Sequence, residues 1–137
     1  MADIFVPEDF AAWQIHLRRM FHRRPEIGWC EYWTTSALAS ECRKMGLAPC
    51  VGREIMEDEG RLGLPDAGKR ADAAKAALAE EEGIPGADPA ILARMGACTG
   101  ALVDLAPDRE PGLVIRCDID ALPVQECGSV THLPHAS

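Results

Sequence analysis

Aromatic side chains are scarce in this sequence, and it contains neither a long apolar run nor a leader-like start. Phe, Trp and Tyr make up 5% of the 137 residues, although hydrophobic residues as a whole make up 47%. The core must therefore be built mainly from small aliphatic side chains. No stretch reaches the ~18 consecutive apolar residues of a membrane span, and the first ten residues lack the basic and then apolar profile of a secretory signal. We expect a cytoplasmic protein without a membrane partner.

Basic residues and closely spaced cysteines are also few. Lys and Arg number 14 against 22 Asp and Glu, for a formal net charge of -8. This charge repels phosphate backbones and argues against nucleic acid as a partner. The six cysteines contain no CxxC pair, which predicts reduced, buried thiols in place of disulfides. A chain of 137 residues has room for one small domain.

Two amphipathic patterns in the first third of the chain predict helices. The first helix is expected to begin near Pro7, to carry an apolar stripe over Phe10–Phe21 and to stop before Pro25. The second is expected over about Glu31–Met45, because Gly46 then supplies the left-handed residue that ends many helices.

The segment 53–95 differs in composition and is predicted to be a helical insertion. Gly and Pro interrupt its first part, and ADAAKAALAEEE then predicts a helix that closes at Gly83. Asp88 and Pro89 predict the start of a short helix over Ala90–Met95. An alanine-rich helix of weak amphipathicity can cover a surface but buries little by itself. We therefore expect the segment to lie outside the sheet, near the mouth of a site.

Two apolar runs of strand type follow this segment. TGALVDL (Thr99–Leu105) and LVIRC (Leu113–Cys117) are separated by turn residues, so they predict a β-hairpin or two neighbouring strands, with the second strand buried. Residues 47–51 predict a short edge strand at most, because Pro49 cannot donate to a ladder. The expected fold class is α/β, with helices packed on a small sheet.

Asp118 and Asp120 directly follow the second predicted strand and are the candidate site residues. Chemistry in α/β folds gathers at the carboxyl ends of strands, and two carboxylates there can hold a divalent cation or orient a ligand. The structural alternative is that one Asp caps the next turn while the other is solvated. Phosphatases and glycosyltransferases that carry Asp-x-Asp after a strand are disfavoured, because only 17 residues follow Asp120.

The four histidines form two pairs, and neither pair has the i, i+4 spacing of a helical metal site. His16 and His22 fall on the first predicted helix, and His132 and His135 lie near the end of the sequence. A zinc set made by His132, His135 and Cys127 is the metal-binding alternative. The favoured interpretation is a loop that contains histidines, without a metal site formed by this chain.

Three stretches together resemble one enzyme family: FHRRPEIGWCEYWT from Phe21, GACTGALVDL from Gly96 and PGLVIRCDIDALPVQE from Pro111. Their order and spacing are similar to the N-terminal third of the metal-dependent amidohydrolases, which include hippurate hydrolase, auxin-conjugate hydrolase and aminobenzoyl-glutamate hydrolase. The segment GREIMEDEGRLGLP from Gly52 and the tail VTHLPHAS resemble the aminobenzoyl-glutamate branch most.

The resemblance implies a two-domain enzyme that hydrolyses the amide bond of an N-acyl amino acid, with aminobenzoyl-glutamate as the first candidate. Its α/β catalytic domain would bind two divalent metals, zinc or manganese, and a smaller inserted domain would make dimer contacts. Residues 1–137 would be the N-terminal part of the catalytic domain, without the lid or dimerisation domain. We expect no activity and no tightly bound metal from this part alone.

Related metallopeptidases have His-x-Asp where this sequence has Asp118 and Asp120. The resemblance implies an orienting role for Asp120, whereas Asp118 stays open as a ligand, an orienter or a cap; both are candidate catalytic residues. The expected partners are the N-acyl amino acid substrate, the remainder of the enzyme chain, and a second copy or a related subunit. The alternative function is a non-catalytic interaction module.

Overall fold

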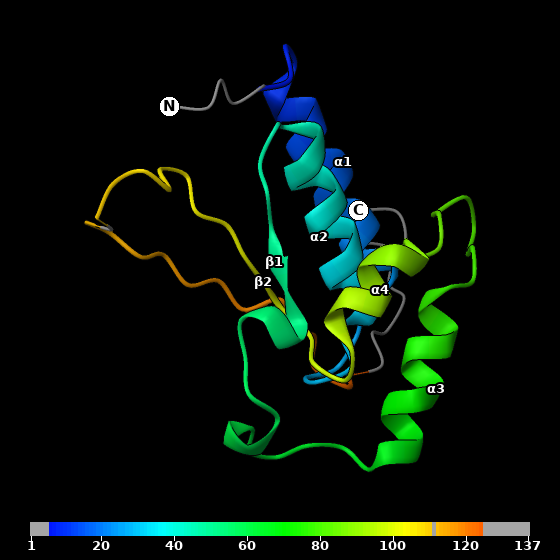
Figure 1. Cartoon of the computed structure of the whole chain (residues 1–137). Coiled ribbons are helices and arrows are strands. Elements are labelled where there is room, and N and C mark those ends of the chain that lie inside the picture. Colours follow the sequence, from blue (N-terminus) through cyan, green and yellow to red (C-terminus); the bar gives the residue numbers. More distant parts are fainter. Residues whose placement is uncertain (1–5, 111, 125–137) are drawn as a thin grey trace.

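A computed structural model describes residues 6–110 and 112–124 of the chain. One helix, α2, occupies the centre of the fold and contacts α3, α4, β1 and β2 (Figure 1). Among the described residues, no helix combines the length and the apolar character needed to cross a membrane. The elements in chain order are α1 (Phe10–Arg23), α2 (Tyr32–Lys44), β1 (Cys50–Val51), η1 (Gly52–Glu54), η2 (Asp58–Gly60), α3 (Ala67–Ala77), α4 (Pro89–Met95) and β2 (Ala101–Leu102), where η denotes a 3-10 helix.

Helix α1 starts later than the sequence pattern predicts. Its N-cap is Asp9, whose side chain accepts a hydrogen bond from the Ala12 N–H at 3.0 Å, so Pro7 lies before the helix. A capping carboxylate supplies the acceptor that a first-turn N–H otherwise lacks, which is why the helix begins here. The predicted apolar stripe is only partly covered: Phe21 packs against the core, whereas Phe10 remains 44% exposed and stacks on Trp13.

Helix α2 forms where it was predicted and supplies the buried centre of the molecule. Gly46 follows it with a φ of 81°, which confirms the left-handed ending. Its buried face includes hydroxyl groups that join other elements: Thr35 Oγ1 accepts from the Gly100 N–H at 2.8 Å, and Ser36 Oγ accepts from the Asp88 N–H at 2.9 Å. The two hydroxyl groups thereby hold the chain before β2 and the start of α4 against α2.

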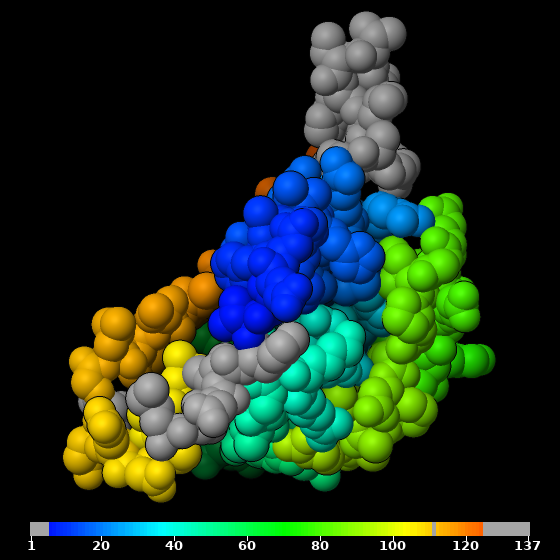
Figure 2. Space-filling view, turned by 90° about the horizontal axis from the view of Figure 1, so that it is seen from above, coloured from blue at the N-terminus to red at the C-terminus, as the bar shows by residue number. Residues whose placement is uncertain are grey.

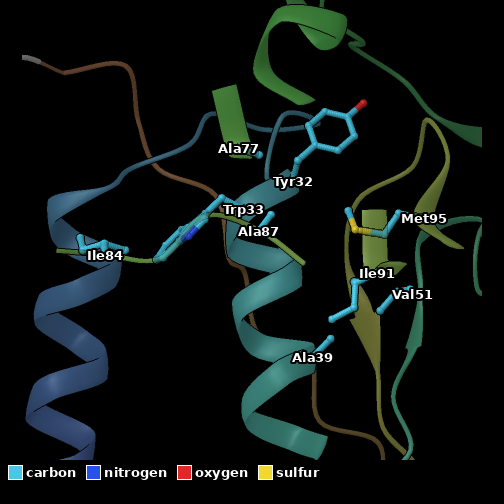
Figure 3. Packing of buried hydrophobic residues seen from close by; sticks show 9 residues of the cluster. All are labelled: Tyr32, Trp33, Ala39, Val51, Ala77, Ile84, Ala87, Ile91 and Met95. Carbon is cyan, nitrogen blue, oxygen red and sulfur yellow. The ribbon is translucent and has the colours of Figure 1, made fainter. Parts of the chain in front are cut away.

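The segment 53–95 contains helices α3 and α4, and among its described residues no strand forms. The alanine-rich helix α3 buries one residue, Ala77, as its pattern predicts, whereas the segment as a whole supplies much of the core. Small alanine side chains let the chain approach α2 closely, and Ile91 and Met95 are completely buried. That the segment is an insertion stays a prediction. Figure 3 shows the core cluster, to which this segment contributes the last five members: Tyr32, Trp33, Ala39, Val51, Ala77, Ile84, Ala87, Ile91 and Met95.

The sheet is smaller than predicted and has a different pairing. β1 and β2 pair antiparallel, with Cys50 opposite Leu102 and Val51 opposite Ala101. The predicted hairpin of Thr99–Leu105 with Leu113–Cys117 is wrong: the second run forms no strand, and Leu113, Val114 and Ile115 are 78 to 82% exposed. Residues before and after the gap at 111 run outward and back as two open arms, yellow and orange in Figure 1.

The run Leu113–Cys117 forms no strand because a segment of high strand propensity also needs a hydrogen-bonding partner and an apolar surface to pack on. Within the described residues, β1 takes the available edge of the 99–105 run, and nothing covers the side chains of Leu113–Ile115. The helices and small sheet agree with a mixed α and β architecture at this coarse level.

A buried arginine joins three parts of the chain. Arg24, just after α1, is 6% exposed and donates to two carbonyl groups near the end of α3, those of Ala76 at 2.7 Å and Ala79 at 2.9 Å. Its guanidinium also lies 5.1 Å from the ring centre of Trp33 on α2. The Trp33 Nε1–H donates to the Pro85 carbonyl at 2.8 Å. Arg24 and Trp33 therefore connect α1, α2 and the segment after α3.

A partly buried glutamate, Glu26, accepts hydrogen bonds from the first turn of α2. The Glu26 carboxylate accepts the N–H groups of Trp33 at 3.0 Å, through Oε1, and Thr34 at 2.7 Å, through Oε2. The N-cap residue itself, Glu31, makes no capping hydrogen bond to the helix. Burial raises the pKa of Glu26 above its ordinary value of 4.5, and the two backbone hydrogen bonds oppose that rise.

We predict that Arg24→Met lowers the free energy of unfolding by roughly 2–4 kcal/mol, because two hydrogen bonds to partly buried carbonyl groups, the cation-π contact with Trp33 and an ion pair with Glu81 are lost. Urea unfolding followed by Trp fluorescence measures this change. The control is Arg23→Met, which removes the ion pair of a less buried arginine with the exposed Glu82. We expect this substitution to cost less than about 1 kcal/mol. Equal effects of the two variants would contradict this role of Arg24.

We also predict a pH dependence of stability that comes from Glu26. Because its pKa is raised in the folded state, the folded protein holds more protons there than the unfolded chain between 4.5 and the raised value. The free energy of unfolding from this group therefore falls as the pH rises through that window. Glu26→Gln should remove this component, as measured by urea unfolding over about pH 4 to 7.

The pKa of Glu54 is shifted in the opposite direction to that of Glu26 and provides a comparison. Hydrogen bonds from Arg94 and from the Val51 N–H lower its pKa below 4.5, so its contribution is present above 4.5 and is lost as the pH falls through the lowered pKa. Glu54→Gln should therefore change the acid side of the stability curve. A Glu26→Gln variant with the same slope as the parent between 4.5 and neutral pH would contradict the Glu26 prediction.

Candidate functional site

The predicted site residues lie in one cavity of about 470 Å³ beside α1. Its walls come from α1, from the turn after it, from the first half of α2 and from the Asp-x-Asp segment. Figure 2 shows α1 in blue with orange residues of the 112–124 segment along one side. The lining residues are Arg18, Phe21, His22, Arg24, Pro25, Glu26, Thr34, Leu38, Cys117, Asp118, Ile119, Asp120 and Ala121.

Asp118 lines this cavity and forms an ion pair with Arg116. Its Oδ1 accepts from the Arg116 guanidinium at 2.6 Å, and both side chains are well exposed, at 69% and 86%. An exposed ion pair of this kind contributes little to stability. The carboxylate of Asp118 is therefore accessible to solvent and to a ligand in the cavity.

Asp120 lies over the turn that follows α1. A Cβ atom added to Gly28 would stand 3.5 Å from Asp120 Oδ2, so the carboxylate is in van der Waals reach of this glycine. The expectation that a buried strand holds Asp120 in place is wrong, because Leu113–Cys117 is exposed. A backbone hydrogen bond from the Ala121 N–H to the Glu26 carbonyl, at 2.7 Å, attaches the Asp120 neighbourhood to the turn instead.

Glu26 is the residue of this site that sequence reasoning missed. Its carboxylate serves α2 and its carbonyl receives Ala121, so one residue touches both the central helix and the Asp-x-Asp segment. A signal was available in the sequence. Helix α2 is preceded by Glu31, a poorer N-cap residue than Ser, Thr, Asp or Asn, so its first N–H groups require an acceptor from elsewhere.

The histidines divide between the cavity and other places. His22 lines the cavity together with Asp118 and Asp120, whereas His16 is an exposed residue of α1. His132, His135 and Cys127 lie outside the described residues. A histidine and two carboxylates around one cavity can exchange protons and accept or donate hydrogen bonds to a polar ligand.

The resemblance to metal-dependent enzymes can be tested against the donor groups of the described residues. Over 6–110 and 112–124, no group of three or more His, Cys, Asp or Glu side chains gathers in a way that could hold a metal ion. A metal in the catalytic centre of a hydrolase has three protein ligands as a rule. The described residues therefore do not fit a metal centre by themselves.

The described cysteines are free thiols with different surroundings. Cys30 and Cys98 are buried and Cys42 is half-buried, and burial raises the pKa of all three. A raised pKa keeps a thiol protonated and weakly nucleophilic. Cys50 and Cys117 are exposed, so the expectation of buried thiols holds for only some of them.

Three curated proteins are similar to this chain. One subunit of the p-aminobenzoyl-glutamate hydrolase of Escherichia coli (strain K12) is 33% identical over 126 residues, which are 88% of this chain and 27% of that protein. The indole-3-acetyl-aspartic acid hydrolase of Enterobacter agglomerans is 35% identical over 118 residues, 85% of this chain and 26% of that protein.

The homolog of the same p-aminobenzoyl-glutamate hydrolase subunit in Haemophilus influenzae (strain ATCC 51907 / DSM 11121 / KW20 / Rd) is 34% identical over 122 residues, 85% of this chain and 27% of that protein. No family model matches the chain. No solved structure matches it either. The chain thus spans about a quarter of the length of the curated relatives, and over that span it is similar to indole-3-acetyl-aspartic acid hydrolase and to this p-aminobenzoyl-glutamate hydrolase subunit.

Proposed function

We propose that the protein takes part in hydrolysing the amide bond of an N-acyl amino acid. The similarity to two differently named hydrolases over at least 85% of the chain carries this proposal. By their names, both relatives act on an aromatic acyl group joined to an acidic amino acid, glutamate in one case and aspartate in the other. We therefore propose aromatic acyl conjugates of acidic amino acids as the substrate class, with p-aminobenzoyl-glutamate as the first candidate.

We assign Asp120 a positioning role in this reaction and Asp118 a supporting one. Both carboxylates line the cavity that His22 and Arg18 also line. An ionised carboxylate in such a place accepts a hydrogen bond from an imidazole, which fixes the tautomer and the orientation of the ring. Asp120 is the stronger candidate because the turn after α1 holds its neighbourhood in place, whereas Asp118 is paired with the exposed Arg116.

A divalent metal, zinc or manganese, belongs to the proposal for a protein of the relatives' length. The donor groups for it would have to include residues other than those described, since these bring no three candidate ligands together. When bound, such a metal polarises a carbonyl group and activates water. The contribution of the present residues is to line the cavity and to place the two carboxylates at it.

The partners are proposed on two grounds. Two of the relatives carry the name of a hydrolase subunit, which supports assembly with a second copy or with a related chain. The exposed side chains of Leu113, Val114 and Ile115 support burial against further protein, because an apolar patch of this kind is unfavourable in water. A purely non-catalytic interaction module is not favoured, because the three relatives bear hydrolase names.

We predict that the 137-residue chain alone does not hydrolyse p-aminobenzoyl-glutamate and retains no stoichiometric metal. The reason is the lack of three converging ligands among its described residues. Dialysis against zinc or manganese, a chelator wash and elemental analysis measure the bound metal, and release of p-aminobenzoate measures the activity. One equivalent of metal that survives the chelator wash would contradict the prediction.

In a polypeptide of the relatives' length, we predict that Asp120→Ala lowers turnover by roughly 10- to 100-fold, as loss of a group that orients an imidazole typically does. Asp118→Ala should lower turnover less. His16→Ala, at an exposed position of α1, is the control and should leave turnover unchanged. Parental turnover in Asp120→Ala, with the fold intact by circular dichroism, would show that this aspartate has no part in the reaction.

A further inference from the structure

Glu26 makes two separate attachments that lie at opposite ends of the same residue. Its side-chain carboxylate holds the first turn of α2 through the N–H groups of Trp33 and Thr34. Its backbone carbonyl accepts the N–H of Ala121 at 2.7 Å, directly beside Asp120. The residue is therefore a direct link between the central helix and the segment that carries the candidate catalytic residues.

The first attachment uses both oxygen atoms of the carboxylate. Oε1 receives one N–H and Oε2 receives the other, so both oxygen atoms act as acceptors at once. A glutamine at this position would direct its NH₂ group at one of the two backbone donors, and one hydrogen bond would be lost. The turn would then be fastened to α2 at one point in place of two, while the length of the side chain stays the same.

The second attachment connects the turn after α1 to the Asp-x-Asp segment that lines the cavity. The turn after α1 touches the Asp-x-Asp segment at Glu26, through the hydrogen bond to Ala121, and at Gly28, which lies under the carboxylate of Asp120. The run Leu113–Cys117 before the segment is exposed and forms no strand. Contacts with the turn, and not a neighbouring strand, therefore hold Asp120 at the cavity.

We propose that Glu26 is a positioning residue, whose carboxylate fastens the turn after α1 to the N-terminus of α2 so that the turn sets the place of Asp120. Its effect on catalysis rests on the proposed function. Its effect on the position of Asp120 does not, because that effect follows from the contacts of this chain alone.

The experiment uses the isotope-labelled 137-residue chain and two variants, Glu26→Gln and the matched control Glu31→Gln. Both glutamates lie near the start of α2 and are at least partly buried, but Glu31 accepts from Thr99 Oγ1 and makes no contact of this kind with Ala121. Amide hydrogen exchange at Trp33, Thr34 and Ala121 reports the two attachments. The ¹³C shift of the Asp120 carboxyl group reports its surroundings.

In Glu26→Gln we expect the exchange protection of Ala121 to fall by roughly tenfold together with that of Thr34 or Trp33, and the Asp120 carboxyl resonance to shift. In Glu31→Gln we expect both reporters at Ala121 and Asp120 to keep their parental values. If Ala121 and Asp120 are unchanged in Glu26→Gln while the α2 amides lose protection, Glu26 is only a helix cap and the proposal is overturned.

If Glu26→Gln does not fold, Glu26→Asp replaces it in the same measurements. Aspartate keeps the charge but is one methylene shorter, so it cannot reach both N–H groups from the same backbone position, and the same losses are expected. The measurements involve no substrate. A lack of amide hydrolysis in a polypeptide of the relatives' length would therefore overturn the proposed function and leave the positioning result as it stands.

Discussion

Charges can leave water in a small core only where they meet compensating partners, and in this protein the two charges that flank Pro25 meet theirs at helix ends. Arg24 donates to carbonyl groups near the end of α3, where the helix also presents the negative end of its dipole. Glu26 accepts N–H groups at the start of α2, where the signs are reversed. The three residues 24–26 thus bind the ends of two helices together, and Trp33 packs under the guanidinium.

The contacts of residues 24–26 with the helix ends also determine the shape of the candidate site. The turn that carries Arg24 and Glu26 also forms one wall of the cavity and receives the Asp-x-Asp segment through Ala121. A site of this type depends on helix capping for the position of its carboxylates, because the neighbouring apolar run forms no strand in the described chain. The same polar groups therefore contribute both to stability and to the geometry that the proposed hydrolysis needs.

The similarity to longer hydrolases accounts for an exposed apolar surface that a small isolated domain would not explain. The relatives are about four times as long as the matched region, and the run Leu113–Ile115 exposes three large apolar side chains. A surface of this kind is what the proposed assembly with further protein would bury. The core built by α2, α4 and the segment between α3 and α4 is complete without it, since Trp33, Ile91 and Met95 are already almost or fully excluded from water.

Local patterns in the sequence determined the elements whose signals are short in range. Helix α2 and its glycine ending, the helix that begins at Pro89, and the position of Asp118 and Asp120 after an apolar run can all be read from neighbouring residues, since capping and periodicity act within a few positions. Tertiary structure decided the rest. It paired β2 with β1 rather than with Leu113–Cys117, and it buried the segment around Ile84 that composition places at the surface. It also brought Glu26 to Ala121, 95 positions away along the chain. Pairing, burial and this contact depend on which partners meet in space, and no local pattern carries that information.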